Sequence, residues 1–323
     1  MNNTKNKITV SSKFITFEQV GREWLSKKEL KVKTSTYNKY KNLLEKHIFP
    51  EFGALQVTEY DIYAFENGLQ KIAYQNSNNF SKSTLKSIVY LVRAIIKYSL
   101  RFGLDSVIEF EFDITDSNSK NIDILSKKDE EILISYLCEN HTLGNLGILL
   151  SLTTGLRIGE VCALSRKNVN FETNVIYICE TAQRLQFENG TQLITTPPKS
   201  SKAYRYVPLP QIVRTYLEQL HIENINEDAY ILTNTATPFE PRTLQYIFKS
   251  ALKKCSIENI NFHALRHTFA TNCVELGFDI KTLSELLGHS SVSFTLNRYV
   301  HSSITHKMQQ MKLLDSWYDS FAE

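Results

Sequence analysis

The 323-residue chain has few cysteines and no long apolar run. Its five cysteines are an odd number and form no C-x-x-C pair, so neither a disulfide framework nor a zinc knuckle is indicated. No stretch approaches the roughly 18 to 20 apolar residues of a membrane-spanning helix, and the polar start MNNTKNK lacks the apolar core of a signal peptide. We therefore expect a cytoplasmic protein without a membrane partner.

Charge is nearly balanced overall but uneven along the chain. The formal net charge is +3, whereas residues 1–104 carry +9 and the remainder carries −6. Lysines with interleaved tyrosines crowd one part of the basic half, a pattern suited to contact with a phosphate backbone. These candidate polyanion-binding residues are Lys27, Lys28, Lys31, Lys33, Lys39 and Lys41. Charge alone leaves a solvated lysine-rich helix face open as the alternative.

Hydrophobic periodicity predicts four helices in the first part of the chain. They are expected within residues 16–30, 35–53, 59–73 and 81–104. The second is expected to be capped by Ser35 or Thr36 and to end at Pro50 and Gly53. The fourth is the clearest, because its apolar residues recur at three- and four-residue steps. Residues 105–124 break this period and are rich in Asp, Ser and Asn, which predicts a linker.

After the linker the pattern changes from helix to strand and back. Helices are expected at 126–138, capped by Ser126, and within 146–164. A small antiparallel sheet is expected from three short runs rich in β-branched and aromatic residues, at 174–180, 191–196 and 203–209. From Leu209 onward the pattern is mostly helical.

The predicted fold class is mainly α with two domains, a helical bundle followed by an α+β domain that contains the small sheet. The expected organisation is a flexible N-terminus at 1–11, a helical domain at 12–104, a linker at 105–124, the α+β domain at 125–301 and a tail helix at 302–323.

The segment NFHALRHTFAT, residues 261–271, places His263 and Arg266 at the expected start of a helix. One helical turn spans 3.6 residues, so the two side chains should share a face beside backbone N–H groups that have no partner. Such a helix start favours an anion such as phosphate, which an arginine fork grips through two oxygens. His267 lies one turn further on, but the zinc pattern H-E-x-x-H is absent, so a packed structural histidine is expected.

Four other motifs surround this segment in a fixed order: TTGLRIGEVCAL, TTPPKSSKAYRYVPL, LLGHSS and TLNRYVH. In chain order the whole set supplies Arg157, Glu160, Lys199, His263, Arg266, His289 and Tyr299. This set resembles the catalytic signature of the tyrosine recombinases, the integrase family that cuts and rejoins DNA. Residues 12–103 also look like the helical core-binding domain of that family, so the resemblance extends over nearly the whole chain.

The resemblance implies a chemical role for each residue. Arg157 and Arg266 bind the non-bridging phosphate oxygens, and His289 adds a further hydrogen bond. His263 donates to an oxygen or accepts the proton of the nucleophile. Tyr299 is the nucleophile that forms the covalent bond to phosphorus.

Other polar residues of these motifs are expected to assist. Lys199 is expected to protonate the departing 5′ oxygen, with Lys202 as the rival for this role. Lys202 and Arg205 are also expected to contact DNA. Glu160 is expected to hold neighbouring catalytic side chains in place, and a plain salt bridge on the helix surface is the alternative.

The resemblance further implies the reaction and the partners. Two transesterifications on double-stranded DNA proceed through a 3′-phosphotyrosyl intermediate and a Holliday junction, without metal, ATP or another cofactor. The protein is expected to be a monomer or weak dimer when free and a homotetramer on synapsed DNA. Residues 14–53 look most like integrases of phages and conjugative elements. Only about a dozen residues precede them, so a Xer-type dimer-resolving recombinase is the main alternative. A topoisomerase IB-like relaxase and a catalytically silent DNA-binding protein are less favoured alternatives.

The tail after Tyr299 carries an apolar stripe at helical spacing. Its members are Ile304, Met308, Met311, Leu314, Trp317 and Phe321. Such a stripe must be buried somewhere, either on the same subunit or, as the family implies, on a neighbouring protomer.

Overall fold

The structure is a computed structural model, and the ranges it describes are 15–76, 80–114, 123–187, 190–198 and 200–289. Beyond these it describes scattered positions between 291 and 321. The chain divides into two compact units, residues 1–119 and 120–323. Within the described ranges, no helix is long and apolar enough to cross a membrane.

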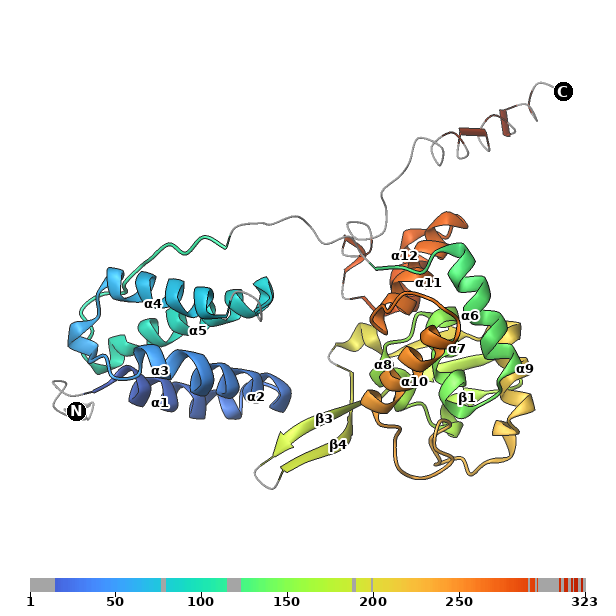
Figure 1. Ribbon diagram of the computed structural model, residues 1–323, viewed down its shortest axis with the longest axis horizontal. Coiled ribbons are helices and arrows are strands. Elements are labelled where there is room, and N and C mark those ends of the chain that lie inside the picture. The colour runs from blue at the N-terminus through green and yellow to red at the C-terminus, as the bar shows by residue number, and fades with distance from the viewer. Residues whose placement is uncertain are drawn as a thin grey trace, which may run out of the picture. The chain divides into compact units, whose positions relative to one another are not determined.

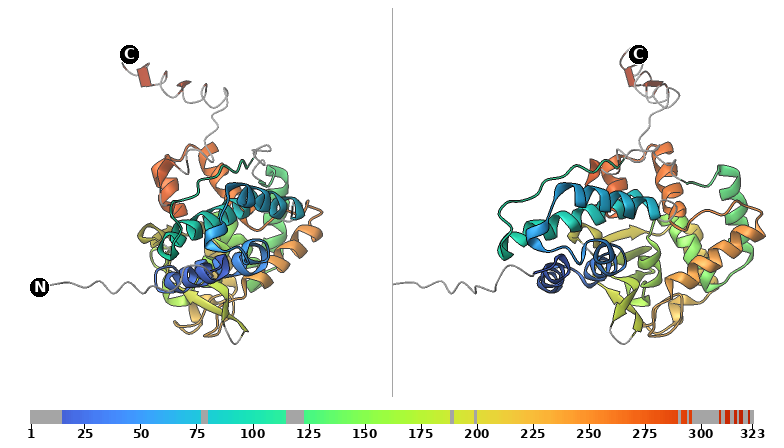
Figure 2. Two further views of the ribbon diagram at one scale, coloured as in Figure 1. Left: turned by 90° about the vertical axis from the view of Figure 1, so that its left-hand side faces the viewer. Right: turned by 60° about the vertical axis from the view of Figure 1, so that its left-hand side comes forward.

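The first unit is a bundle of helices (Figure 1). They are α1 (Phe17–Glu29), α2 (Thr34–Leu43), the π-helical turn η2 (Leu44–Ile48), α3 (Phe49–Phe52), the 3₁₀ turn η3 (Val57–Glu59), α4 (Ile62–Gln75), α5 (Lys82–Ser99) and the 3₁₀ turn η4 (Leu100–Phe102). The long helices lie side by side in the views of Figure 2. Their apolar faces enclose one core, to which Phe17, Leu44, Phe65 and Ile95 contribute fully buried side chains.

The second helix differs from its predicted ends. It begins at Thr34 after Lys33, which forms no side-chain cap, so the predicted cap at Ser35 or Thr36 is wrong. Pro50 does not end it either, because the chain continues through η2 into α3. Pro50 lies at the start of α3, where a missing N–H costs little. Gly53 caps α3, as predicted.

The stretch predicted as a linker has no helix or strand over residues 105–114. It is nevertheless attached to the first unit, because Phe110 is buried in the bundle core. The guanidinium of Arg93 donates to the Phe110 carbonyl at 2.8 Å and lies over its ring. Alternating apolar residues in this stretch thus serve as an anchor.

The second unit is mostly helical around a small sheet, so the predicted fold class is confirmed. Its α-helices are α6 (Lys127–Glu139), α7 (Leu143–Thr154), α8 (Ile158–Cys162), α9 (Gln211–Gln219), α10 (Pro241–Lys254), α11 (His263–Glu275) and α12 (Ile280–Leu287). Its 3₁₀ turns are η5 (Arg166–Asn168), η6 (Ser201–Ala203) and η7 (Ile222–Asn224). Nearly every side chain of α7 is buried, so this helix forms the centre of the unit.

The strands form two antiparallel sheets in place of one. Strands β1 (Val169–Asn170), β2 (Val175–Ile178) and β5 (Arg205–Pro208) pair in the order β1-β2-β5. Strands β3 (Thr181–Phe187) and β4 (Gly190–Thr196) pair as a separate hairpin that projects from the rest of the unit (Figure 1). Strand β3 was missed because its sequence TAQRLQF is largely polar and shows no run of β-branched and aromatic residues. It is a strand because it pairs with β4.

Candidate active site

The loop between α7 and α8 places Arg157 at the start of α8. Gly155 ends α7 in the left-handed region with φ +69°, and a Cβ there would lie 2.5 Å from the ring of Phe269. Arg157 then precedes α8 with extended backbone, and its side chain is 37% exposed. The glycine turn thus presents a partly exposed guanidinium beside a buried helix.

Glu160 is a buried carboxylate shared by two arginines. It accepts from Arg157 Nη1 at 2.8 Å and from the Arg157 backbone N–H at 2.9 Å. Arg205 donates to both of its oxygens, at 3.1 and 2.8 Å. Burial raises the pKa of Glu160, but the hydrogen bonds and charge of Arg205, together with those of Arg157, outweigh burial and lower the pKa to about 2. The ion pair is therefore buried and ionised, unlike the surface salt bridge considered as the alternative.

Arg266 lies on the first turn of α11 with only 1% of its surface exposed. It donates to the Gly155 carbonyl at 2.6 Å and to the Leu287 carbonyl at 2.7 Å, and it lies 2.8 Å from His289 Nε2. A guanidinium can only donate, so Nε2 of His289 accepts, and Nδ1 carries the ring proton. That proton is donated to Thr295 Oγ1 at 2.7 Å. In this arrangement Arg266 fixes the orientation and tautomer of His289.

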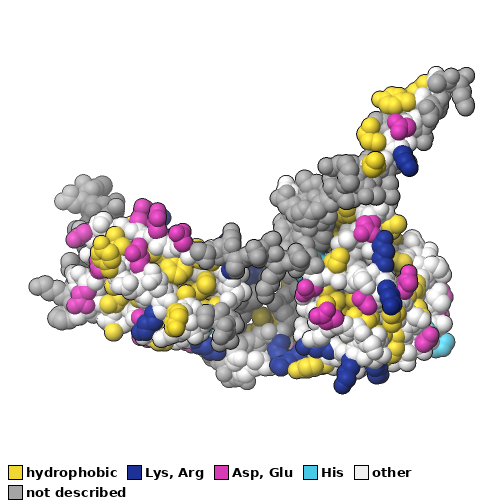
Figure 3. All heavy atoms as spheres, turned by 45° about the horizontal axis from the view of Figure 1, so that its top comes forward, with side chains coloured by type: hydrophobic (Ala, Val, Ile, Leu, Met, Phe, Trp, Pro, Cys, Tyr) yellow, Lys and Arg dark blue, Asp and Glu magenta, His cyan; other side chains and the backbone are white. Residues whose placement is uncertain are grey.

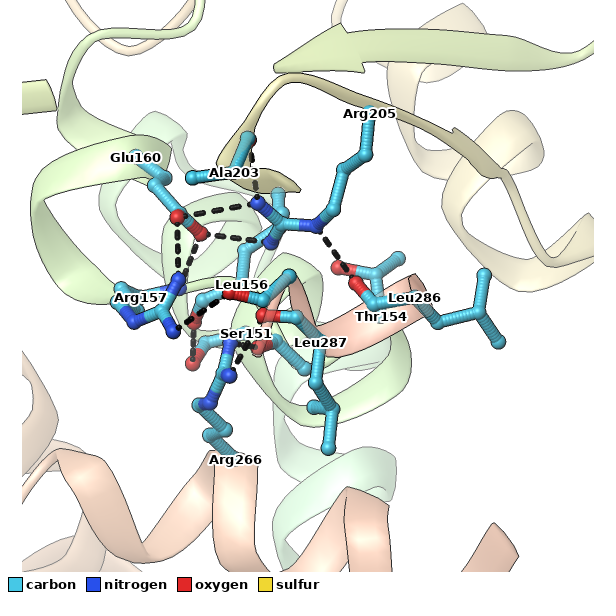
Figure 4. A network of polar contacts seen from close by, with 12 residues as sticks. Ser151, Thr154, Leu156, Arg157, Glu160, Ala203, Arg205, Arg266, Leu286 and Leu287 are labelled. Atoms are coloured by element: carbon cyan, nitrogen blue, oxygen red, sulfur yellow. Dashed lines mark hydrogen bonds and ion pairs between the residues drawn. The ribbon is translucent and has the colours of Figure 1, made fainter. Parts of the chain in front are cut away.

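Three arginines converge on the end of α12 (Figure 4). The pairs are Arg205 Nε with the Leu286 carbonyl at 2.6 Å, Arg266 Nη2 with the Leu287 carbonyl at 2.7 Å, and Arg157 Nη2 with the Gly288 carbonyl at 3.3 Å. Carbonyl groups at a helix C-terminus have no partner within the helix and carry partial negative charge. One helix end therefore gathers three guanidinium groups, of which two also bind the Glu160 carboxylate, and the result is a positively charged cluster suited to an anion.

His263 is exposed at the start of α11, whereas Arg266 is buried, so the two do not share one open surface as predicted. The ring of His263 packs edge-on against His267, with centroids 4.5 Å apart. The helix start also lacks the expected open N–H group at Ala264, because Asn261 accepts that hydrogen bond through its side chain and its carbonyl. His263 instead lines a small cavity of about 150 Å³ beside the loop that carries Arg157.

Two predicted catalytic residues, Lys199 and Tyr299, lie outside the described residues. Lys202, the rival of Lys199, is described and exposed. It lines an open groove of about 550 Å³ together with Arg205 and His289. The described residues include no group of three or more His, Cys, Asp or Glu side chains that could hold a metal ion.

The lysines predicted to bind a polyanion lie on the first unit, at α1, α2 and the turn between them. Lys31, Lys33 and Lys41 are exposed. Others make local contacts: Lys27 binds Glu23 at 2.7 Å, and Lys39 donates to Ser87 Oγ at 2.8 Å. Lys28 lies over the Trp24 ring. On the face in Figure 3, this unit exposes both acidic and basic side chains.

Sequence reasoning missed a row of cations on α5 and the following turn η4. Lys86, Arg93, Lys97 and Arg101 are exposed, and with Lys28 they line an open groove of about 910 Å³. The same groove contains the aromatic side chains of Trp24, Tyr90 and Tyr98. The steps of seven, four and four residues were visible in the sequence and indicate one helix face. They were overlooked because the apolar stripe of this helix dominated its pattern.

Comparisons with known proteins agree with these features. The model of the Phage integrase family matches residues 123–306, and that of the Phage integrase N-terminal SAM-like domain matches residues 16–69. A Tyrosine recombinase XerC-like protein of Caldanaerobacter subterraneus subsp. tengcongensis is 28% identical over 59% of this chain and 54% of its own length. The transposase from transposon Tn916 of Enterococcus faecalis is 27% identical over 80% of this chain and 65% of its own length. The chain thus spans about half to two thirds of these relatives.

Solved structures share the fold. The Tn1549 transposon integrase in complex with transposon right end DNA is 21% identical, with a TM-score of 0.76, and the match covers 93% of this chain and all of that one. A lambda integrase tetramer bound to a Holliday junction is 14% identical, with a TM-score of 0.61, over 93% of this chain and 84% of that one. Because its family model covers more than half of the 323 residues, the chain belongs to the phage integrase family, and the resemblance to tyrosine recombinases is confirmed.

Proposed function

We propose that this protein is a site-specific DNA recombinase, the integrase of a mobile element, which cuts and rejoins double-stranded DNA. The observation that carries the proposal is the convergence of Arg157, Arg205 and Arg266 on the end of α12, where Arg157 and Arg205 also share the Glu160 carboxylate. Phosphodiester cleavage builds negative charge on the phosphate oxygens, and cations fixed before the reaction stabilise that charge without reorganising.

In the proposed reaction, the Tyr299 oxygen attacks phosphorus, and the bond from phosphorus to the 5′ oxygen breaks. A 3′-phosphotyrosyl link and a free 5′-hydroxyl result. The 5′-hydroxyl of a partner strand then attacks the link, releases Tyr299 and forms a Holliday junction. The energy of the broken bond is kept in the phosphotyrosyl link, so the cycle requires neither ATP nor a metal ion.

The described residues have distinct tasks in this proposal. Arg157 and Arg266 bind the non-bridging oxygens. His289 accepts from Arg266 through Nε2, so it must carry a proton on that nitrogen, as the imidazolium or the other tautomer does, to donate to a phosphate oxygen. His263, exposed beside the Arg157 loop, donates to an oxygen or accepts the proton of Tyr299. Two motif lysines complete the set: Lys199 supplies the proton to the leaving 5′ oxygen, and Lys202, in the groove beside His289, is its rival.

DNA affinity comes from the first unit in this account. The α5 groove combines cations with aromatic rings, a surface suited to the sugar-phosphate backbone. The lysines identified from the sequence remain further candidates for DNA contact. They are Lys27, Lys28, Lys31, Lys33, Lys39 and Lys41 in the first unit and Lys202 in the second unit. We propose that the protein acts in the cytoplasm, where it reaches DNA.

We propose a homotetramer on synapsed DNA, with a monomer or weak dimer in its absence. A solved lambda integrase is a tetramer on a Holliday junction, and its fold is similar. Within the tail stripe, Ile304 and Leu314 lie outside the described residues. Met308, Met311, Trp317 and Phe321 are exposed in the single chain, which supports burial against a neighbouring protomer.

A Xer-type recombinase is the second candidate. The Tyrosine recombinase XerC of Staphylococcus aureus is 24% identical, and the match covers 79% of this chain and 82% of its own length. The sequence identities of the two kinds of relative are alike, and we favour the mobile element because the Tn1549 integrase shares the fold over 93% of this chain.

The test is to trap the covalent protein–DNA adduct in cells by rapid denaturation and to sequence the attached DNA. The proposal predicts attachment at the ends of one mobile element and at its insertion site. Attachment at a single chromosomal dimer-resolution site would support the Xer-type candidate. Absence of any adduct, with DNA binding intact, would contradict the proposed chemistry.

A further inference from the structure

Arg205 lies in the wrong place for the DNA contact that the sequence suggested. Its side chain is 5% exposed, and it lies on β5, where it pairs with Ile178 of β2. Its described hydrogen bonds go to protein groups: the two Glu160 oxygens, the Leu286 carbonyl and the Ala203 carbonyl. The hydrogen bonds described above for Arg266 reach neutral groups, whereas Arg205 is paired with a carboxylate, which a phosphate would have to displace.

Arg205 instead joins three segments of the second unit. Through Glu160 it holds the start of α8, next to Arg157. Through the Leu286 carbonyl, 2.6 Å away, it holds the end of α12, just before His289. Through the Ala203 carbonyl, 3.2 Å away, it holds η6, which follows Lys199 in the sequence. Each segment adjoins a proposed catalytic residue.

The turn after α12 is shaped around Arg205. Gly288 has φ +60°, and a Cβ built on it would lie 3.0 Å from Arg205 Nη1. Only glycine adopts this conformation at little cost and also leaves room for the guanidinium. The Gly288 carbonyl is the one that accepts from Arg157, so both arginines lie close to this residue.

Arg205 also balances the charge of Glu160, which would otherwise act on Arg157. Glu160 is close to Arg157, with 2.8 Å between Oε1 and Nη1, and without another cation the carboxylate would cancel the charge of that phosphate-binding arginine. Arg205 binds the same carboxylate through two parallel hydrogen bonds, the strongest geometry for this pair. Glu160 can then orient Arg157 while its charge is balanced from the buried side.

We propose that Arg205 is a positioning residue of DNA cleavage, which balances Glu160 and fixes the end of α12 so that Arg157 faces the phosphate with its positive charge uncancelled. This inference rests on the proposed function. It separates two tasks within one buried cluster: Arg157 and Arg266 bind the phosphate, and Arg205 binds only the protein.

The experiment measures half-site binding and the single-turnover rate of covalent attachment, on the DNA recovered by adduct sequencing. Arg205→Lys keeps the charge but loses the two-pronged geometry. We expect it to bind DNA within about threefold of the unaltered protein and to react about 10- to 100-fold more slowly, the usual cost of losing a group that orients a functional side chain. Arg242→Lys, which changes an exposed arginine on α10 of the same unit, is the matched control and should react normally.

A pair of variants separates charge balance from general support. In the otherwise unaltered protein, Glu160→Gln should slow attachment, because Arg157 loses its orienting partner. In an Arg205→Met background, the same Glu160→Gln change should accelerate attachment, because it removes the charge that then cancels Arg157. Rates are taken per molecule that binds the half-site, so that recovered folding does not count as acceleration; on this scale a purely structural role predicts no acceleration in the Arg205→Met background, and that result would overturn the proposal. The double variant also removes the unpaired buried charge, so it stays informative if Arg205→Met alone folds poorly.

Other outcomes are equally decisive. If unaltered protein binds the site but forms no adduct, the proposed function fails first. If it forms the adduct and Arg205→Lys reacts at the normal rate, only the inference about Arg205 fails. If Arg205→Lys instead weakens DNA binding and lowers its salt dependence while the rate at saturating DNA is unchanged, Arg205 contacts DNA and the proposal is wrong.

Discussion

The two units use their basic side chains in opposite ways. In the second unit, Arg205 and Arg266 are buried and bound to backbone carbonyls and to Glu160 or His289. In the first unit, cations such as Lys86 and Lys97 are exposed along one helix face. Burying a cation costs desolvation energy and fixes the direction of its N–H groups. An exposed cation keeps its hydration and can adjust to the DNA backbone along its surface.

The contrast indicates that DNA affinity and the rate of DNA cleavage depend on different basic residues of the chain. Rate depends on charges that are already oriented when the transition state forms. Affinity for a polyanion depends on how many counterions are released, with little regard to exact geometry. Changes in the second unit should therefore alter rates, and changes in the first unit should alter binding and its salt dependence.

The largest expected effect lies outside the described residues. Lys199→Ala should slow cleavage by about 10² to 10⁴, the usual range for general acid catalysis, with little change in binding. A DNA substrate with sulfur in place of the leaving 5′ oxygen needs no acid and should largely restore the rate. Lys202→Ala is the matched control, and rescue of that variant instead would transfer the role to Lys202.

Arg266→Lys should slow covalent attachment by about 10² to 10³, the usual cost of losing one fixed donor at developing charge. Lysine keeps the charge but cannot span the Gly155 carbonyl, the Leu287 carbonyl and His289 from a single nitrogen. The measurement is single-turnover attachment at saturating DNA. A loss of half-site binding with an unchanged rate would break the division between the two units.

The ionisation of Glu160 should make the free energy of unfolding depend on pH in the acid range. Its pKa is lowered from 4.5 to about 2 in the folded chain, so its ionisation stabilises the fold fully above about pH 4.5, and this contribution is lost as pH falls toward 2. The free energy of unfolding of Glu160→Gln should be lower than that of the unaltered protein by on the order of 3 kcal/mol near neutral pH. Urea titrations should show this gap closing between about pH 4.5 and 2, and a gap independent of pH would contradict the buried ion pair.

The smallest effect is expected on the α5 groove. Changing Lys86, Lys97 and Arg101 to glutamine should lower the salt slope of DNA binding by about 0.9 for each phosphate that is no longer neutralised, with the attachment rate at saturating DNA unchanged. The variant with alanine at Lys31, Lys33 and Lys41 is the parallel test of the other lysine set. A set that leaves the slope unchanged is only solvated surface.

Much of the fold followed from periodicity, and the limits were physical. Helix α5 was clear because its apolar stripe is local, and Ser126 was visible as a cap because capping is local too. Strand β3 was not, because its pairing with β4 is a property of two segments together. The course of the chain through Pro50 likewise depends on packing around α3.

The site shows the same limit. Motif order identified Arg157, Arg266 and His289, and the structure brings these three to one helix end. The sequence could not show that Arg205 points inward to Glu160, because alternation along a short strand does not identify the buried residue that a side chain contacts. Nor could it show the hydrogen bonds that Asn261 makes to the start of α11.

The central claim is that Tyr299 forms a covalent bond to DNA within this arginine cluster. The direct measurement is digestion of the trapped adduct followed by mass spectrometry of the peptide that carries the nucleotide. The account predicts a 3′-phosphoryl group on Tyr299, and complete loss of the adduct with retained half-site binding in Tyr299→Phe. An adduct on another residue, or one that persists in Tyr299→Phe, would contradict it.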